Sequence, residues 1–455
     1  MSTGIVNDLA TFVTGTSYAD LSEDVRHACK RALIDYIAVA TLGSVQDKTK
    51  ILAEYLSTFE SKKECSIIGT SLRMDCANSA FLNGSSAHSL DFDDGHRRGS
   101  VHIEAVVLPA VLAVAEKYHA SAEKIIAAIA VGYDVMARIS MAIHPYALNR
   151  GFHNTPVAGV FGATAAAASL LELDKAAVID AFGLAGSFSG GLYAYMQNGA
   201  DTKRLHPGKA ARDGIICAEL AKRGYKGPTD IFEGPYNFFE AIPGDFDGNV
   251  LTDGLGTEYQ VCRIYQKPYA SCRHLHGPID CVRKIKEQHP DICSIEDIKA
   301  IRIGTYGVAM KHAAKNYNNM LEIQMSIPCA VSIAMVDDRV TVDSFSPERF
   351  SADSQEVKLL EKITVEVDEQ CQSVYPNARP AKLWIEKNDG TVYFAELENP
   401  RGGAEDPLSD SELENKLIYN CSSIIGSERC RALLNLIWKL EKLSEEELHQ
   451  LFCVK

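Results

Sequence analysis

The chain has 455 residues, a length typical of about two or three domains. Its hydrophobic content of 46% and charged content of 23% are those of an ordinary globular protein that can bury a large core. The formal net charge of −14 argues against a nucleic-acid partner, because phosphate binding needs a basic surface, but it does not exclude a small anionic substrate.

The chain up to about residue 230 is predicted to be helical. Ser22 has the character of a helix N-cap, apolar residues follow it at helical spacing, and Gly43 ends the run. Further helices are predicted over residues 51–59, 75–89 and 104–118. The apolar, Ala-rich segments 125–141 and 157–171 have wide hydrophobic stripes, so we expect them to be buried within a helical bundle.

The pattern changes after about Val261. Alternation predicts strands over 300–306 and 362–367, and the strands 383–386 and 392–396 flank a hairpin turn at Asn388-Asp389-Gly390. Helices are predicted over 278–287 and 326–335, and the last fifty or so residues are helical again, with Ser409 and Ser427 as caps. The predicted fold is mostly α with an α+β part: a helical domain (1–265), a smaller α+β domain (266–404), and C-terminal helices (405–455) that return to the helical domain.

The thirteen cysteines are scattered, odd in number and free of C-x-x-C pairs. This usage, with no signal-peptide pattern at the N-terminus, predicts reduced thiols in a cytoplasmic protein. The apolar runs are judged shorter than the ~18 residues that a membrane-spanning helix requires, so we expect no membrane association.

Acidic and imidazole side chains are crowded between residues 88 and 102, at a helix–loop–helix junction. Such groups are costly to desolvate unless they pair with each other or with a ligand, so the segment is a candidate chemical site. Four further segments (151–156, 201–209, 267–276 and 324–329) also hold chemical groups, the second just before a predicted helix. Seven of the thirteen histidines lie in the opening segment and the first three of these, namely His88, His96, His102, His153, His206, His274 and His276.

Two kinds of site fit this pattern. A metal site would use His88, Asp91 and His96, but their spacing matches no familiar zinc motif and basic groups near them in sequence would repel a cation. A metal-free acid/base site fits better, because Lys203, Arg204, Lys209 and Arg273, together with helix N-termini, suit a small di- or tricarboxylate. Taken singly, each of these histidines is more commonly structural. The remaining ones are interpreted as structural: His27, His119, His144, His289, His312 and His449.

The chain resembles the MmgE/PrpD superfamily, which includes 2-methylcitrate dehydratase, cis-aconitate decarboxylase and iminodisuccinate epimerase. The resemblance runs in order from about residue 5 to about residue 450. It rests on Asn83-Gly84-x-x-Ala87-His88-Ser89-Leu90-Asp91-Phe92-Asp93-Asp94 with His102, on Phe152-His153, on Thr202-Lys203-x-Leu205-His206-x-Gly208, and on Lys267-Pro268-Tyr269 with His276 and Asp280.

The resemblance implies a helical domain with a smaller α+β lid, a homodimer, a site between the two domains, and no cofactor or metal. Carried over from the decarboxylases, the catalytic residues are Asp91, His102, His153 and Lys203. This chain departs from their pattern at Cys272, where decarboxylases have a histidine, and at Cys329, where they have a tyrosine. The departures argue against cis-aconitate decarboxylation and leave dehydration or epimerisation of a related acid.

The chemistry expected of such a site is proton removal beside a carboxylate, which needs a base and cationic stabilisation of the resulting anion. Cys272 is added to the catalytic residues, since the neighbouring charge of Arg273 would favour a thiolate. His206, Arg273 and His276 are expected to bind the substrate. We therefore expect a dehydratase-like lyase, with an epimerase or isomerase as the alternative. A metal-dependent hydrolase and a catalytically dead binding protein rank lower.

Overall fold

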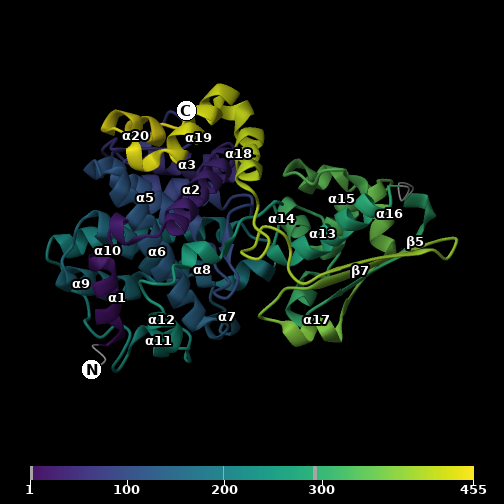
Figure 1. The fold of residues 1–455 in the computed structure, drawn as a ribbon, viewed down its shortest axis with the longest axis horizontal. Helices are drawn as coiled ribbons and strands as arrows, with labels where there is room; N and C mark the ends of the chain where they lie inside the picture. Colours follow the sequence, from purple (N-terminus) through teal and green to yellow (C-terminus); the bar gives the residue numbers. More distant parts are fainter. Residues whose placement is uncertain (1–3, 198, 291–294) are drawn as a thin grey trace. The chain divides into compact units, whose positions relative to one another are not determined.

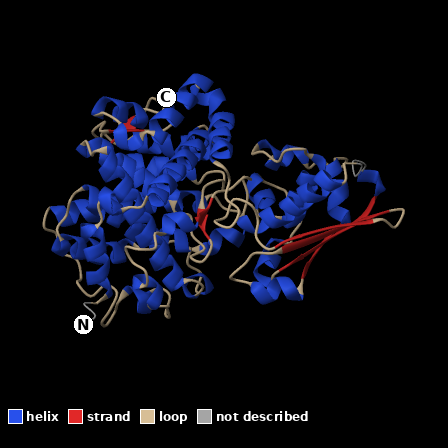
Figure 2. Ribbon diagram, in the orientation of Figure 1, coloured by secondary structure: helices blue, strands red, loops and turns tan. Residues whose placement is uncertain are grey.

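The computed structural model describes residues 4–197, 199–290 and 295–455, which form two compact units. The helical unit comprises the described residues of Met1–Ser89, Asp93–Tyr265 and Ser409–Lys455, and the α+β unit comprises those of Leu90–Phe92 and Gln266–Leu408 (Figure 1). Strands are concentrated in the α+β unit, whereas helices dominate elsewhere (Figure 2). The predicted fold class, mostly α with an α+β part, is confirmed.

The described part of the helical unit is built from two runs of helices and two short strand pairs. The two-stranded pairs are β1 (Cys65–Ser66) with β2 (Arg73–Met74), and β3 (Gly95–His96) with β4 (Ile264–Tyr265). The first run contains α1 (Ile5–Gly15), α2 (Glu23–Ser44), α3 (Asp47–Ser57), α4 (Cys76–Ala87), α5 (Glu104–Tyr118), α6 (Ala122–Ile143), α7 (Tyr146–Asn149), α8 (Asn154–Leu170), α9 (Lys175–Phe188), α10 (Thr202–Lys222), α11 (Phe238–Ala241) and α12 (Asn249–Thr252).

The centre of this unit is α8, which packs against α5, α6, α9 and α10. Every residue of α8 except Ser169 is buried, as its wide apolar stripe predicted. Helix α6 is also buried, and by length and composition alone it could cross a membrane. The expectation that no apolar run reaches that length was therefore wrong. The apolar part of α6 that meets these criteria is wholly buried inside the protein, as is common for core helices of globular domains.

The second run of helices is C-terminal and consists of α18 (Asp410–Ile425), α19 (Ser427–Trp438) and α20 (Glu445–Phe452) (Figure 1). Helices α18 and α19 pack on α2, and α20 packs on α5 and α19. Lys416 of α18 forms an ion pair with Asp35 of α2, and both side chains are buried. The Ser409 cap is confirmed, because its side chain accepts the Glu412 N–H. The Ser427 cap was wrong: the cap residue of α19 is Gly426, whose φ of 84° suits glycine.

The α+β unit holds a four-stranded sheet in the order β6-β5-β7-β8. Its strands are β5 (Ile298–Thr305), β6 (Ile363–Val367), β7 (Ala381–Lys387) and β8 (Val392–Leu397), and only the β5–β6 pair is parallel. The predicted hairpin between β7 and β8 is confirmed. The helices are α13 (Arg273–Gln288), α14 (Met320–Gln324), α15 (Ile327–Val336), α16 (Gln355–Lys362) and α17 (Glu369–Val374). Helices α13, α15 and α16 lie on one side of the sheet and α17 on the other (Figure 1).

Two glycines of the family-like motifs let α4 and α10 touch through their backbones. A Cβ built on Gly84 would lie 2.8 Å from the Gly208 Cα, and one built on Gly208 would lie 2.1 Å from the Phe81 carbonyl oxygen. Real Cβ atoms do not approach backbone this closely, so any larger residue would force the helices apart. This contact brings the C-terminal end of α4, where His88 lies, to the first turns of α10.

We expect Gly208→Ala to lower the free energy of unfolding by about 1–3 kcal/mol, because the new methyl group overpacks a rigid backbone contact. Gly15→Ala is the matched control, since a Cβ on Gly15 meets nothing within 4 Å. That variant should be neutral or slightly more stable, because alanine restricts the unfolded chain. Urea unfolding of both variants checks this, and equal stability of the two would contradict the close-contact argument.

Candidate active site

In the helical unit, the buried His88 and Asp93 form a cluster with the partly exposed His102. His88 is the C-cap residue of α4, and its Nδ1 lies 2.7 Å from the Asp93 Oδ2. The His102 Nδ1 lies 3.7 Å from the same oxygen and 2.7 Å from the Asp94 carbonyl oxygen, to which it donates. The His88 and His102 ring centroids are 4.7 Å apart. Because His102 donates from Nδ1, the proton of its neutral ring lies on Nδ1, and Nε2 is the nitrogen that can accept a proton.

Asp94 serves the fold rather than the chemistry. Its Oδ1 accepts the N–H groups of Ile103 and Glu104 at the start of α5, and the Tyr133 hydroxyl donates to its Oδ2. Burial raises the pKa of Asp94 to about 7, although the Glu104 N–H opposes this shift. Asp93 and Asp94 are both fully buried: Asp94 caps a helix, and Asp93 binds an imidazole.

A second pair of imidazoles and a lysine complete the set in this unit. His153 is the N-cap residue of α8, and its Nδ1 lies 2.9 Å from the His206 Nδ1 in α10. Lys203 lies in the first turn of α10 and is 5% exposed. The prediction that 201–209 precedes a helix was wrong, because α10 begins at Thr202 and accommodates Pro207. The charges of Lys203 and His88 both act on His153 and His206.

These surroundings keep His153 and His206 neutral. Burial lowers the pKa of His153 well below its usual value, and the charges of His206, His88 and Lys203 lower it further. Burial likewise lowers the pKa of His206 to about 4, with His88, Lys209 and Lys203 acting in the same direction. At neutral pH the two rings are therefore uncharged, and such rings can accept a proton from a ligand whose binding supplies negative charge.

The pKa of His206 predicts how stability depends on pH. In the unfolded chain this ring binds a proton below about pH 6.5, whereas the folded protein resists protonation until about pH 4. The unfolded state thus binds more protons in that window, and stability falls as the pH drops from 6.5 to 4, by at most about 1.4 kcal/mol per pH unit. We expect His206→Gln to flatten this dependence in urea unfolding, while His119→Asn, at an exposed position, leaves it unchanged. Equal slopes for wild type and His206→Gln would contradict the prediction.

In the α+β unit, Asp91 is held by a buried lysine that sequence analysis did not place in the site. Asp91 adopts a left-handed φ of 52°, which is unfavourable for most residues but tolerated by aspartate. The Lys267 Nζ donates to its carbonyl oxygen at 2.7 Å and to its Oδ1 at 2.9 Å. The Gln324 Nε2 donates to the carbonyl oxygens of Leu90 and Ala270, both at 2.8 Å. The Asp91 carboxylate is therefore fixed in position.

Arg273 and His276, predicted to bind the substrate, contact the chain itself. The Arg273 guanidinium donates to the carbonyl oxygens of Arg401 and Pro400 at 2.7 Å, and its Nη1 lies 3.1 Å from the His276 Nδ1. The His276 Nε2 lies 3.2 Å from the Ser271 carbonyl oxygen. Burial, Arg273 and Lys267 lower the pKa of His276 well below its usual value. Both residues thus have a structural role, and substrate binding by them stays a prediction.

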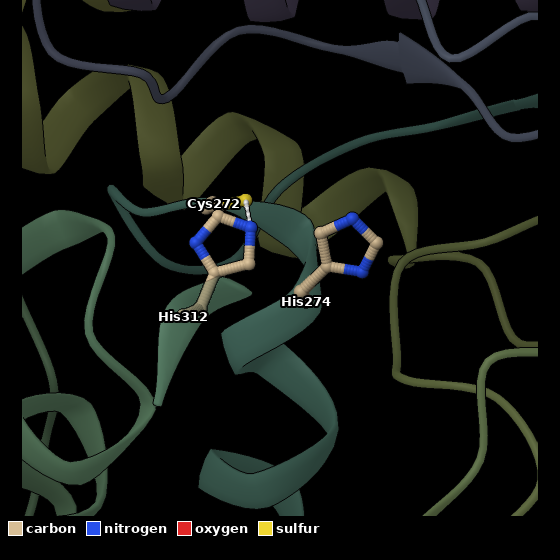
Figure 3. Close-up of side chains that lie close together, drawn as sticks. All are labelled: Cys272, His274 and His312. Carbon is tan, nitrogen blue, oxygen red and sulfur yellow. Dashed lines mark hydrogen bonds between the residues drawn. The ribbon is translucent and has the colours of Figure 1, made fainter. Parts of the chain in front are cut away.

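Cys272 lies beside His312, a residue that sequence analysis interpreted as structural (Figure 3). The Cys272 Sγ is 3.8 Å from the His312 Nε2. Burial opposes ionisation of the thiol, but the charge and hydrogen bond of His312 outweigh it and lower the pKa of Cys272 to about 7. Arg273, the expected cause, is not among the largest causes of this shift, and its guanidinium donates to the carbonyl oxygens of Arg401 and Pro400. By contrast, burial raises the pKa of Cys329 to about 11.

The ligand set of the metal alternative does not come together as predicted. Among the described residues, His96 belongs to no group of potential ligand atoms within 4.8 Å of one another. Its Nδ1 instead accepts the Gly99 N–H at 3.2 Å. Groups with suitable spacing do include His88, Asp93 and His102 in the helical unit, and Cys272, His274 and His312 in the α+β unit. Both groups lie where the acid/base chemistry is expected.

Comparisons with known proteins match nearly the whole chain. Residues 7–250 match the MmgE/PrpD N-terminal domain and residues 269–442 the MmgE/PrpD C-terminal domain. A cis-aconitate decarboxylase-like protein of Aspergillus oryzae is 28% identical over 464 residues, covering 96% of this chain and 94% of the relative. The cis-aconitate decarboxylase of Aspergillus terreus is 25% identical, covering 97% of this chain and 94% of the relative. The human cis-aconitate decarboxylase is 25% identical, covering 98% and 93%.

The N-terminal and C-terminal parts of the chain therefore match the N-terminal and C-terminal domains of one family of enzymes, in the same order. The relatives named here span almost their full length in the match, so the similarity is not confined to one domain. The chain belongs to the MmgE/PrpD family.

Proposed function

We propose that this protein is a cofactor-independent lyase, dehydratase-like, that acts on a small di- or tricarboxylic acid by moving a proton next to a carboxylate. The observation that carries the proposal is the set of buried His88, His153, His206 and Lys203 with the partly exposed His102 in the helical unit. An ammonium group whose charge acts on the neutral rings of His153 and His206 suits an anionic acid, because together they supply charge neutralisation and proton acceptors.

In the proposed reaction, a base of the site takes the proton from the carbon beside a carboxylate. The electron pair of the broken C–H bond moves into that carboxylate, and Lys203 stabilises the anion that forms. The β-hydroxyl then leaves as water after accepting a proton from an acid of the site, and a carbon–carbon double bond results. His102 and His153 are proposed to transfer protons during the reaction, and His206 is proposed to orient His153. Asp91 is proposed as a further catalytic group.

Decarboxylation is the reaction named for the relatives, and it competes with this proposal. The argument against it is Cys272, because the resemblance implies a histidine at this position in the decarboxylases. A thiol with a pKa of about 7 forms an anionic base when it ionises, whereas an imidazole is a neutral base. We therefore favour a related hydroxy acid over cis-aconitate as the substrate.

A second candidate function, epimerisation of an acid of the same class, is favoured by the same thiol. An epimerase needs a proton donor and a proton acceptor, and Cys272 exchanges protons near neutral pH. The distinguishing property is the product: an epimerase exchanges the α-proton with solvent and forms no alkene, whereas a dehydratase forms one.

The test is turnover by chelator-treated protein of 2-methylcitrate, citrate and cis-aconitate, followed by ultraviolet absorbance and by NMR in deuterated water. We expect an unsaturated product from a hydroxy acid. Deuterium exchange without alkene would favour the epimerase, and loss of carbon dioxide from cis-aconitate would establish a decarboxylase. Activity that needs added zinc, manganese or iron would favour the metal-dependent hydrolase, and no turnover of any acid would refute the proposal.

We further propose a cytoplasmic homodimer that binds neither nucleic acid nor membranes. The twelve described cysteines are all free thiols, which is common in a reducing compartment. Size-exclusion chromatography with light scattering tests the dimer, and a monomer at micromolar concentration would refute it.

A further inference from the structure

We propose that Cys272 and His312 form a thiolate–imidazolium pair that accepts the carbon-bound proton of the substrate, with His312 as the positioning residue that keeps Cys272 charged. The substrate part of this inference rests on the proposed function, whereas the ion pair itself does not. Neither the similarity to known proteins nor the sequence pattern assigns a role to His312.

The geometry around His312 fixes its ring against the thiol. Its Nδ1 donates to the Met325 carbonyl oxygen at 3.0 Å, so the opposite nitrogen, Nε2, faces the Cys272 Sγ at 3.8 Å. The His274 ring stacks on it with centroids 5.2 Å apart and planes 23° apart (Figure 3). His274 is held in turn by the Tyr306 hydroxyl at 2.6 Å. A backbone carbonyl on one ring nitrogen and a thiol on the other stabilise the doubly protonated imidazolium.

The electrostatic surroundings favour a charged pair. Cys272 is the N-cap residue of α13, a sixteen-residue helix, so the partial positive charge of the helix start stabilises a thiolate. Asp91 is the acidic group that opposes it, and Asp91 also stabilises the His312 imidazolium. Burial by itself would lower the pKa of His312, but Cys272 outweighs burial and raises it. Each partner thus favours the charged form of the other.

The two residues differ in accessibility in the way that a catalytic pair requires. Cys272 is partly exposed, whereas His312 is 4% exposed. Cys272 is therefore the more accessible partner, and the proposal assigns the contact with the substrate to its sulfur. In the proposed step the substrate C–H bond breaks, an S–H bond forms at Cys272, and the electron pair moves into the adjacent carboxylate as an enediolate. The thiol later returns its proton to solvent or to the product, so no other reactant is needed.

The test measures the ionisation of Cys272 directly, without turnover. Alkylation by iodoacetamide is followed between pH 5 and 10, with the Cys272 peptide quantified by mass spectrometry. We expect an alkylation midpoint near pH 7 in the wild type. His312→Gln should raise the midpoint by at least ~1 pH unit, towards the ~8.5 of an ordinary thiol. His289→Gln, which changes a partly buried histidine of the same unit, is the matched control and should leave the midpoint unchanged. Cys272→Ser identifies the peptide.

A wild-type midpoint above ~8.5, or an unchanged midpoint in His312→Gln, would overturn the ion pair. Protection of Cys272 that a chelator removes would also overturn it, in favour of a Cys/His/His metal site. If His312→Gln does not fold, His312→Asn replaces it in the alkylation experiment. The ionisation of Cys272 can also be followed by thiolate absorbance against pH, as the difference between the wild type and Cys272→Ser. If the alkylation midpoint of Cys272 is near pH 7 but the protein turns over no carboxylic acid, the ion pair is supported and only the proposed function is refuted.

The catalytic part has its own readout. If the thiolate is the base, Cys272→Ser should lower kcat by at least ~10²-fold with KM little changed, because an alcohol does not ionise at neutral pH. His312→Gln should move the acidic limb of the kcat–pH profile upward together with the alkylation midpoint. A modest loss of kcat in Cys272→Ser would refute the role of the sulfur as base.

Discussion

Replacing Lys203 with alanine is expected to lower kcat/KM by at least ~10²-fold, equivalent to about 2.7 kcal/mol of transition-state stabilisation. Lys203 is 5% exposed and lies where its charge acts on both His153 and His206. A buried ammonium group interacts strongly with an anion that forms beside it, because little solvent is present to screen the attraction. Steady-state kinetics on the acid identified by the turnover screen measures the effect.

Lys222→Ala is the matched control, because Lys222 lies at the exposed end of the same helix. It should change kcat/KM less than ~2-fold, as expected for a surface charge. Since Lys203 is buried, Lys203→Ala also leaves a cavity, so Lys203→Met, which keeps the volume and removes the charge, is measured beside it. Activity retained in Lys203→Met but lost in Lys203→Ala would show that packing, not charge, is the contribution of this residue.

The elements predicted well are those whose signals are local. Helix α5 spans Glu104–Tyr118 as predicted, because a long apolar run ends at a left-handed His119. The β7–β8 hairpin follows from Asn388-Asp389-Gly390, whose glycine has a φ of 89°. The start of α10 was missed, because Pro207 and Gly208 are read as helix breakers although packing against α4 overrides their poor propensity.

The site residues that were missed depend on contacts between distant parts of the chain. His312 is 40 residues from Cys272, and Lys267 is 176 residues from Asp91, so no local pattern pairs them. Arg273 was preferred as the partner of Cys272 because it is adjacent in sequence. Successive residues of a helix point in different directions, however, and the guanidinium turns towards the 400–401 backbone. Sequence analysis could identify four site residues of the helical unit because each lies near a helix start in a polar motif: His102, His153, Lys203 and His206.

His102→Asn is expected to lower kcat/KM by at least ~10²-fold while the fold is retained. The asparagine amide can still donate to the Asp94 carbonyl oxygen, which His102 contacts at 2.7 Å, but it has no nitrogen that titrates near neutral pH. The variant therefore separates the proton-transfer role of the ring from its structural bond. Circular dichroism and thermal unfolding establish the fold, and the kcat–pH profile establishes whether a titrating group has been lost.

His119→Asn provides the control for that substitution. The His119 side chain is 76% exposed, and its φ of 52° is one that asparagine tolerates, so neither stability nor rate should change appreciably. If His102→Asn and Lys203→Ala both kept near-wild-type rates while His119→Asn behaved as expected, the acid/base centre would lie outside the imidazole cluster of the helical unit. The thiolate–imidazolium pair of Cys272 and His312 would then be the remaining candidate for proton transfer, and its alkylation profile is independent of that outcome.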